Sequence, residues 1–282
     1  MHSSDQQATA VADSPSLGLT GVSETLLVPL AYRALEAERR DALVRDPYAL
    51  QIVQQTGLDL NRFRTLGGQV DVAVRTEILD RAVARFFETH PTGTVVNLGA
   101  GLDARGLRLA PEGSTWYDLD LPPVIELRRR FLPESDTRIC IPKSLLDLTW
   151  FDDVAASPRS PVLLIAEGVF PYFHETVLRD FVTKTIDRFP RAELLFHSTA
   201  PWMVREVHKD GPLQGMVAPF RWGTSSGRTI ETWDSRIEFI EEWPYIKRHP
   251  SRWGWRRYAA MLPLAGRWLR EVMKIAHVRF HG

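Results

Sequence analysis

A glycine turn and two carboxylates downstream of it have the types and spacing that a nucleotide-binding site requires. The segment VVNLGAGLDARGLRL, which begins at Val95, is an apolar run that breaks at Gly99 and Gly101 and continues as a helix-like pattern. Glycine lets the backbone turn sharply and approach a ligand where a Cβ would intrude. Asp118 and Asp120 follow about twenty residues later, where an acid that ends the next strand can reach ribose hydroxyls. The segment therefore predicts a strand, a turn and a helix, with a cofactor site at the turn.

The glycine pattern by itself leaves the cofactor open. Gly99-x-Gly101-x-x-Ala104 also fits the dinucleotide fingerprint, so it favours a nicotinamide or flavin cofactor as much as S-adenosylmethionine, and a turn without a ligand remains an alternative. A P-loop is excluded because no Gly-Lys-Ser/Thr follows. The histidines lack metal-ligand spacing, and the single cysteine, Cys140, lies in an apolar run typical of a buried strand. We expect no metal site and no internal disulfide.

The composition indicates one globular domain. Of the 282 residues, 44% are hydrophobic and 25% are charged, and 35 basic side chains balance 35 acidic ones. This balance favours a small or neutral partner over nucleic acid or a membrane, although it allows a local charged patch. The first residues lack the apolar core of a signal peptide, and no run reaches membrane-spanning length, which predicts a cytoplasmic location.

Hydrophobic periodicity divides the chain into successive regions. Residues 1–18 are polar and predict a disordered tail, and residues 19–90 carry two helical stripes that predict a helical cap. Alternating strand and helix patterns over residues 91–200 predict a cofactor-binding core of the α/β class, with a doubly wound, Rossmann-like parallel sheet. This rhythm stops in residues 201–235, which we expect to form a lid, and residues 236–282 supply the last strands and a helix. The expected strands are Val95–Leu98, Thr115–Leu119, Arg138–Pro142, Val162–Ala166, Leu194–His197, Ile237–Glu241 and Ala276–Phe280.

The lid expectation rests on the aromatic residues after position 200. Seven of the nine tryptophans lie there, among the glycines Gly211, Gly215, Gly223 and Gly227. Such a segment could close over a flat substrate and exclude water, although any single tryptophan is better interpreted as a packing residue.

Four motifs in chain order resemble one known family. They are NLGAGLDAR, YDLDLPPVIELRRR, SLLD ending at Asp147, and LLIAEGVFPYF. This order resembles the S-adenosylmethionine-dependent methyltransferases that group leucine carboxyl methyltransferases with polyketide O-methyltransferases of the tetracenomycin type. The resemblance covers most of the chain, since VAVRTEILDRAV looks like the Arg-containing helix before the family's first strand. It implies a class I methyltransferase fold with S-adenosylmethionine (SAM) as cofactor, while a homodimer remains an open alternative to a monomer.

The glycine motif and the acidic residues after it are expected to bind different parts of SAM. Gly99 and Gly101 would let the backbone lie against the methionine moiety, with the amides of the turn near its carboxylate. Asp120 closes the second strand and is the best ribose ligand, as the corresponding acid is in the family. Asp118 shares its strand face, but a solvated or helix-pairing acid is an equal interpretation. Asp103 is better interpreted as a helix cap than as a ligand.

The later motifs contain the residues expected to bind the adenine and the methionine moiety of SAM. Asp147 lies where a carboxylate can accept the adenine amino hydrogen, with helix capping as its alternative role. Glu167 ends an apolar strand and needs a partner or water; in the family, this glutamate lies beside the methionine ammonium. Arg75 matches the family's guanidinium for the cofactor carboxylate, whereas spacing alone favours an exposed helix charge, and Arg33 is a weaker candidate. The predicted cofactor-binding residues are Arg75, Gly99, Ala100, Gly101, Asp120, Leu121, Asp147, Leu148 and Glu167.

Two further side chains are candidates for the transfer site. The resemblance places Tyr172 toward it, and Tyr172 and His197 are the geometric candidates for a general base if the acceptor is a phenol. The preferred interpretation is an O-methyltransferase that acts on a small, aromatic or polyketide-like hydroxyl or carboxyl acceptor. The alternatives are a protein C-terminal carboxyl methyltransferase, a nicotinamide oxidoreductase, and a cofactor-binding protein without catalysis.

Overall fold

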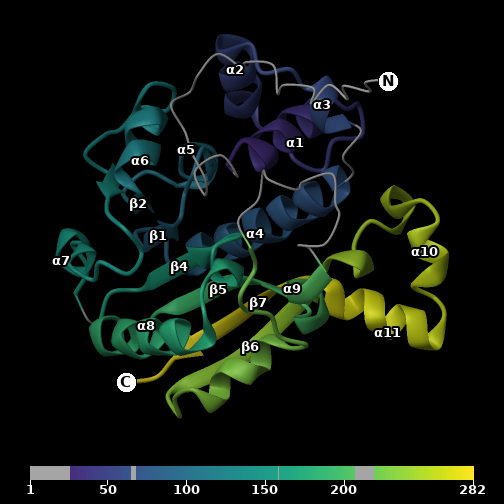
Figure 1. Ribbon diagram of the computed structural model, residues 1–282. Coiled ribbons are helices and arrows are strands. Elements are labelled where there is room, and N and C mark those ends of the chain that lie inside the picture. Colours follow the sequence, from purple (N-terminus) through teal and green to yellow (C-terminus); the bar gives the residue numbers. More distant parts are fainter. Residues whose placement is uncertain (1–25, 65–67, 158, 207–218) are drawn as a thin grey trace, which may run out of the picture.

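A seven-stranded sheet forms the centre of the protein in the computed structural model, which describes residues 26–64, 68–157, 159–206 and 219–282. The strands are β1 (Thr94–Leu98), β2 (Thr115–Asp120), β3 (Arg138–Pro142), β4 (Val162–Ala166), β5 (Glu193–Thr199), β6 (Ile237–Pro244) and β7 (Met273–Phe280). They lie in the order β3-β2-β1-β4-β5-β7-β6 (Figure 1). Strands β1 to β5 run parallel, and β7 is antiparallel to both β5 and β6. The doubly wound sheet is thus confirmed, with an antiparallel pair at one end.

The predicted and observed ends of the strands agree for some strands and differ for others. β3 and β4 have the predicted bounds, and β1 and β2 differ by one residue each. β5, β6 and β7 are longer than predicted, because the antiparallel ladders continue until Thr199 pairs with Met273 and Pro244 pairs with Lys274. The length of these strands is therefore set by their partners rather than by their own apolar runs.

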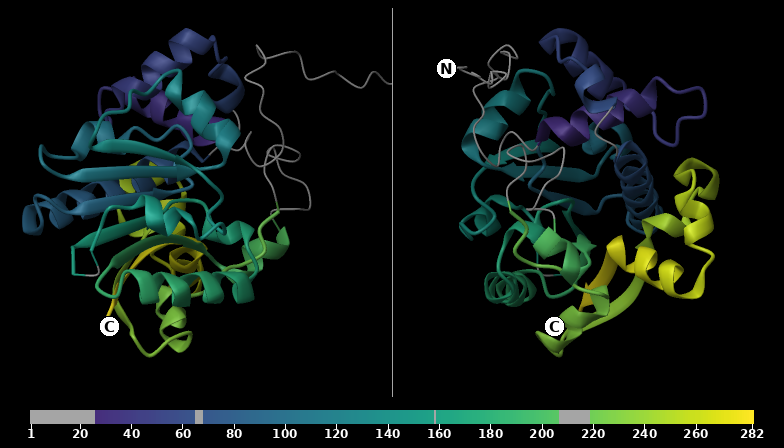
Figure 2. Two further views of the ribbon diagram at one scale, coloured as in Figure 1. Left: turned by 90° about the vertical axis from the view of Figure 1, so that its left-hand side faces the viewer. Right: turned by 45° about the vertical axis from the view of Figure 1, so that its right-hand side comes forward.

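Helices cover both faces of the sheet (Figure 2). Val95 packs in a buried cluster with α4 (Gln69–Thr89), whereas the next residue, Val96, packs in a cluster with α8 (Glu175–Arg188). Successive strand residues point to opposite faces, so one apolar run supplies both cores. The other helices and 3₁₀ turns that follow β1 are α5 (Arg105–Leu109), α6 (Pro122–Arg129), α7 (Trp150–Asp153), η2 (Phe170–Tyr172), α9 (Pro201–Glu206), η3 (Gly227–Thr232), η4 (Tyr245–Lys247), η5 (Pro250–Trp253), α10 (Arg256–Ala259) and α11 (Pro263–Val272).

Three N-terminal helices form a cap beside the sheet: α1 (Leu27–Ala37), α2 (Pro47–Thr56) and α3 (Asn61–Arg64) (Figure 1). The start of α2 is fixed by Asp46, whose side chain accepts the Ala49 N–H. The apolar sides of these helices share one buried cluster with residues of the α5 and α6 regions. The described part of the N-terminal region is therefore helical, while the division of the chain into a cap and a cofactor-binding core stays a prediction.

Arginines from the C-terminal region fasten this cap and α4. Arg252 Nη2 lies 2.6 Å from Glu36 Oε2 of α1, and Arg248 Nε lies 2.9 Å from Glu77 Oε2 of α4. Glu36 and Glu77 are both buried. Since a buried carboxylate without a partner is costly, these ion pairs join segments far apart in the sequence.

Several expectations fall outside the described residues. The predicted tail, 1–18, lies there, as do residues 207–218 of the predicted lid. In the described part of the lid region, Trp222 and Trp233 are buried in the core that includes Phe170. These two tryptophans are packing residues, while the lid itself stays a prediction. None of the described helices combines the length and the apolar character that crossing a bilayer requires.

Candidate active site

A cavity of about 260 Å³ lies at the carboxyl ends of the central strands. It is bounded by the glycine turn after β1, the end of β2, the segment after β4 and the start of α1. β1 lies between β2 and β4, which is where the strand order reverses. Open α/β sheets bind ligands at such a switch point.

The turn after β1 requires glycine. Gly99 has φ +67° and Gly101 has φ +50°, and a Cβ on Gly99 would lie 2.4 Å from Val169 Cγ2. The N–H groups of Gly99 and Ala100 donate to Leu119 O, at 2.8 and 3.1 Å. These two amides thus have partners inside the protein, and their predicted place near a ligand carboxylate stays a prediction.

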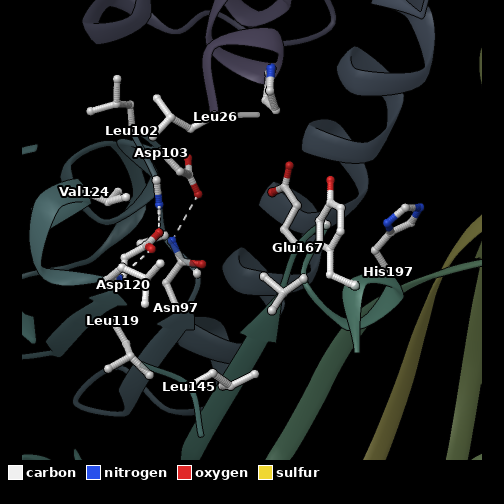
Figure 3. A pocket seen from close by; sticks show the side chains of 18 of the residues that line it. Leu26, Asn97, Leu102, Asp103, Leu119, Asp120, Val124, Leu145, Glu167 and His197 are labelled. Carbon is white, nitrogen blue, oxygen red and sulfur yellow. Dashed lines mark hydrogen bonds between the residues drawn. The ribbon is translucent and has the colours of Figure 1, made fainter. Parts of the chain in front are cut away.

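Asp120 is held by backbone amides at the edge of the cavity. Its Oδ2 accepts the Gly101 N–H and its Oδ1 accepts the Leu121 N–H, each at 2.7 Å (Figure 3). Burial raises the pKa of Asp120, and these two N–H groups oppose the increase. The carboxyl group therefore has a fixed orientation before any ligand is present, and both Asp120 and Leu121 line the cavity.

Asp118, two residues earlier, has a structural role. It is buried and pairs with Arg128 Nη2 of α6 at 2.5 Å, and it also accepts from Trp116 Nε1 and Asn97 Nδ2. Of the interpretations left open by the sequence, the helix-pairing acid is confirmed and the solvated acid is wrong.

A shared carboxylate, Glu167, links two arginines at the other side of the cavity. Arg75 Nε lies 2.7 Å from its Oε1, and Arg105 Nη2 lies 2.8 Å from its Oε2. Burial opposes ionisation, but the charges of Arg75 and Arg105 outweigh it and hold the pKa of Glu167 well below its usual range. Arg75 is also largely buried, so the exposed-charge interpretation of this residue is wrong.

Arg105 has two further carboxylate partners, Asp103 at 2.5 Å and Asp80 at 2.7 Å. Asp103 also accepts the backbone N–H of Arg105 at the start of α5, as expected of a capping residue. Arg105 lies within NLGAGLDAR but is not among the predicted site residues. Arg33, the weaker candidate, is buried, lines the cavity and donates to both Asp46 of the cap and the Leu102 carbonyl.

Asp147 and Leu148 are not among the residues that line the cavity. Asp147 is exposed, and its Oδ1 accepts from the backbone N–H and the hydroxyl of Thr149, just before α7. This is a contact within the loop, because Thr149 is the N-cap residue of α7 and no N–H group of that helix donates to the Asp147 side chain. The two bonds lower the pKa of Asp147. Ser144 and Leu145 of the same loop do line the cavity. The adenine role of Asp147 and Leu148 stays a prediction.

His197 lies on the side of the cavity that carries Glu167 (Figure 3), and Tyr172 is also part of the cavity lining. The ring of Tyr172 lies 5.3 Å from that of Phe220, another residue of the cavity lining. His197 is buried and stacks on Tyr245, and neither of its ring nitrogens has a hydrogen-bond partner among the described residues. Burial and the charge of Arg75 lower the pKa of His197 to about 3, so its ring is neutral near pH 7.

The remaining chemistry-bearing residues give no second centre in the described chain. Cys140 is buried on β3 as predicted, and burial raises the pKa of its thiol to about 11. No group of three or more His, Cys, Asp or Glu side chains is arranged to hold a metal within the residues that the structure describes.

Comparison with solved structures supports the fold. A crystal structure of a Thermobifida fusca protein proposed to be a methyltransferase covers 97% of this chain and all of its own, with a TM-score of 0.60 and 13% identity. A Streptomyces avermitilis protein of the duf574 family covers 89% of this chain and 96% of its own, with a TM-score of 0.57 and 16% identity. The sheet order and the position of the cavity define an α/β protein of the Rossmann-like class, with its candidate ligand site at the switch point of the sheet.

Sequence comparison narrows this class to a family. The family model described as leucine carboxyl methyltransferase matches residues 27–185. The chain is 33% identical over 234 residues to the tetracenomycin polyketide synthesis O-methyltransferase of Streptomyces glaucescens, with 82% of this chain and 86% of that protein covered. It is 31% identical over 252 residues to an S-adenosyl-L-methionine-dependent methyltransferase of Gibberella zeae, with 81% and 84% covered. The chain belongs to the leucine carboxyl methyltransferase family.

Proposed function

We propose that this protein transfers the methyl group of SAM to an oxygen atom of a small acceptor, aromatic or polyketide-like, that carries a hydroxyl or carboxyl group. The observation that carries the proposal is the division of the cavity into two sides. One side holds the fixed carboxylate of Asp120, and the other combines Glu167 with the rings of Tyr172 and Phe220. The relative in Streptomyces glaucescens, by its name a polyketide O-methyltransferase, supports the choice of oxygen.

The side chains of the cavity suit the parts of SAM. Asp120 presents a carboxylate to ribose hydroxyls, while Arg75 and Glu167 match a ligand carboxylate and ammonium. The close approach of Gly99 to Val169 leaves no room for a Cβ beside this site. We assign Gly99, Ala100 and Gly101 to the methionine moiety, Asp120 and Leu121 to the ribose, and Asp147 and Leu148 to the adenine.

The protein positions the acceptor and excludes water. When bound, SAM supplies an electrophilic methyl group on a positively charged sulfur. Aromatic side chains at Tyr172 and Phe220 favour a planar acceptor, and holding the acceptor oxygen in line supplies much of the rate. A pKa of about 3 makes His197 a poor general base, so we assign it as a neutral hydrogen-bond partner of the acceptor. A carboxylate acceptor needs no base.

Methyl transfer with a panel of acceptors tests the proposal. Planar aromatic compounds that differ only in carrying a hydroxyl, a carboxyl, an amine or a thiol are incubated with the protein and SAM, without added metal. We expect methylation of an oxygen arm, detected by mass spectrometry, and a lower turnover for Tyr172→Phe with unchanged SAM affinity. Methylation confined to the amine or the thiol would contradict the assignment of oxygen.

The buried imidazole predicts a pH dependence of stability. The pKa of His197 is lowered from 6.5 to about 3, so between these values the unfolded state binds a proton that the folded state excludes. Stability from this residue is full above pH 6.5 and is lost as the pH falls. Between pH 7 and 5, the wild type should lose about 2 kcal/mol more of its free energy of unfolding than His197→Phe. Urea unfolding at several pH values measures this difference, and equal losses in both proteins would refute it.

A further inference from the structure

Two short helices near the C-terminus, α10 and α11, project from the body of the protein (Figures 1 and 2). The segment from Trp255 to Leu262, which we call the hairpin tip, contains α10 and the turn that leads to α11. Its large apolar side chains face solvent: Trp255 is 74% exposed, Tyr258 59%, Met261 81% and Leu262 60%. Single exposed apolar residues are ordinary, but four within eight successive positions mark an interaction surface.

The scaffold under the hairpin tip is closely packed. A Cβ on Gly266 would lie 2.2 Å from the Ala260 carbonyl oxygen, so only glycine lets α11 approach the end of α10 this closely. Trp268 of α11 stacks on Trp202 of α9 with 4.5 Å between ring centroids. The apolar side chains of the tip are therefore held outward by a fixed support.

The stretch of sequence that contains the hairpin tip is rich in basic residues. No acidic residue occurs between Trp243 and Arg270, a stretch that contains these seven basic residues: Lys247, Arg248, Arg252, Arg256, Arg257, Arg267 and Arg270. Arg248 and Arg252 are turned toward the carboxylates of α4 and α1. At the tip itself, the guanidinium of Arg257 lies over the Tyr258 ring, 4.4 Å from its centroid, and Arg256 is about half exposed. The chain as a whole is neutral, so this positive charge is local.

We propose that the hairpin tip docks the protein on an anionic membrane surface. Tryptophan and tyrosine favour the level of the lipid headgroups, and methionine and leucine side chains can enter the acyl boundary. Arginines beside them can pair with lipid phosphates, and their stems can lie along the apolar surface. The net charge of the whole chain is zero, but the surface at the hairpin tip is expected to be positive.

Two other occupants fit the same side chains less well. A second copy of this chain that docked tip to tip would bring the Arg256 and Arg257 side chains of both copies into one interface, and like charges in an interface are unfavourable. An acidic protein could pair with the arginines of the hairpin tip. However, the apolar side chains stand on a projecting turn, a shape that can enter a lipid interface without a matching concave partner.

The hairpin tip is connected to the region of the cavity. Arg256 Nη1 lies 3.6 Å from Asp71 Oδ2 in the first turn of α4, and Arg75, one turn further along the same helix, lines the cavity. Docking would therefore bring the membrane to the side of the protein on which α4 begins. The proposal does not depend on the chemical identity of the acceptor.

Co-sedimentation with lipid vesicles tests the proposal with the full chain. Vesicles of phosphatidylglycerol and phosphatidylcholine in equal parts are compared with vesicles of phosphatidylcholine alone, at low and high salt. We expect about tenfold tighter binding to the anionic vesicles, and a loss of this preference at high salt. Trp255→Ser combined with Met261→Ser should weaken binding by about tenfold or more, since apolar insertion is lost. Arg256→Ser combined with Arg257→Ser should remove the preference for anionic lipid.

The control variant is Leu146→Ser, which replaces an exposed leucine on another surface. It should bind vesicles as the wild type does. Because every substituted side chain is exposed, the melting temperatures of all variants should agree, which separates lost docking from lost folding. Three outcomes would overturn the proposal: no vesicle binding at low salt, equal binding by the tip variants, or a dimer detected by light scattering that the tip variants dissociate. Capture of an acidic protein with no affinity for vesicles would overturn it as well.

Discussion

Replacing Arg105 with methionine is expected to lower the free energy of unfolding by about 3–5 kcal/mol, the usual cost of removing one partner from a buried ion pair. Arg105 is fully buried and bonds Asp80, Asp103 and Glu167. Methionine fills much of the volume but leaves these carboxylates with less counter-charge. Urea unfolding at neutral pH measures the change, and Arg105→Lys should recover part of the loss because it restores one positive charge.

The matched control is Arg81→Met on α4. Arg81 pairs with Glu77 on the same helix, but its side chain is 66% exposed, so its loss should cost less than about 1 kcal/mol. If Arg105→Met were no more destabilising than Arg81→Met, the ion-pair network around Glu167 would contribute nothing to folding, and its role would have to lie in ligand binding alone.

Asp120→Ala is expected to weaken SAM binding by about 1–3 kcal/mol, or roughly 5- to 150-fold, because a charged acceptor is removed from the proposed ribose site. The variant also leaves the Gly101 N–H without its present acceptor, so some stability of the free protein is lost as well. Calorimetry well below the melting temperature separates affinity from folding. Unchanged affinity in the folded variant would assign Asp120 to the turn alone.

Asp147→Ala provides the comparison for this experiment. Asp147 is exposed and accepts from Thr149, so a hydrogen bond that it accepted from the adenine amino group would compete with water. We expect a smaller loss of SAM affinity than for Asp120→Ala, up to about tenfold. A larger loss for Asp147→Ala would mean that the adenine contact, rather than the ribose contact, dominates affinity.

The parallel strands could be predicted from the sequence because burial on both faces leaves a continuous apolar run. β4, Val162–Ala166, is such a run, and its predicted bounds are those of the structure. The turn after β1 could be predicted as well, because two closely spaced glycines directly after an apolar run are typical of a sharp turn with positive φ angles. By contrast, the end of β5 is decided by its pairing with β7, where Thr199 pairs with Met273, 74 residues later in the sequence.

The charged part of the site could not be predicted in the same way. Arg105 bonds Asp80 and Glu167, which lie 25 and 62 residues away, and no helical or strand period relates such positions. The side-chain direction of Asp147 could not be predicted from the sequence for a different reason. The sequence places it in a loop at the cavity edge of the sheet, but the local bonds to Thr149 decide which way its side chain points.

The ion pairs between the two ends of the chain have a consequence for synthesis on the ribosome. Glu36 and Glu77 are made early, yet their partners Arg252 and Arg248 follow 216 and 171 residues later. At translation rates of about 5–20 residues per second, roughly ten seconds or more pass between the synthesis of each glutamate and that of its arginine partner. The N-terminal helices therefore cannot reach their final packing before Arg248 and Arg252 have been made and have left the exit tunnel.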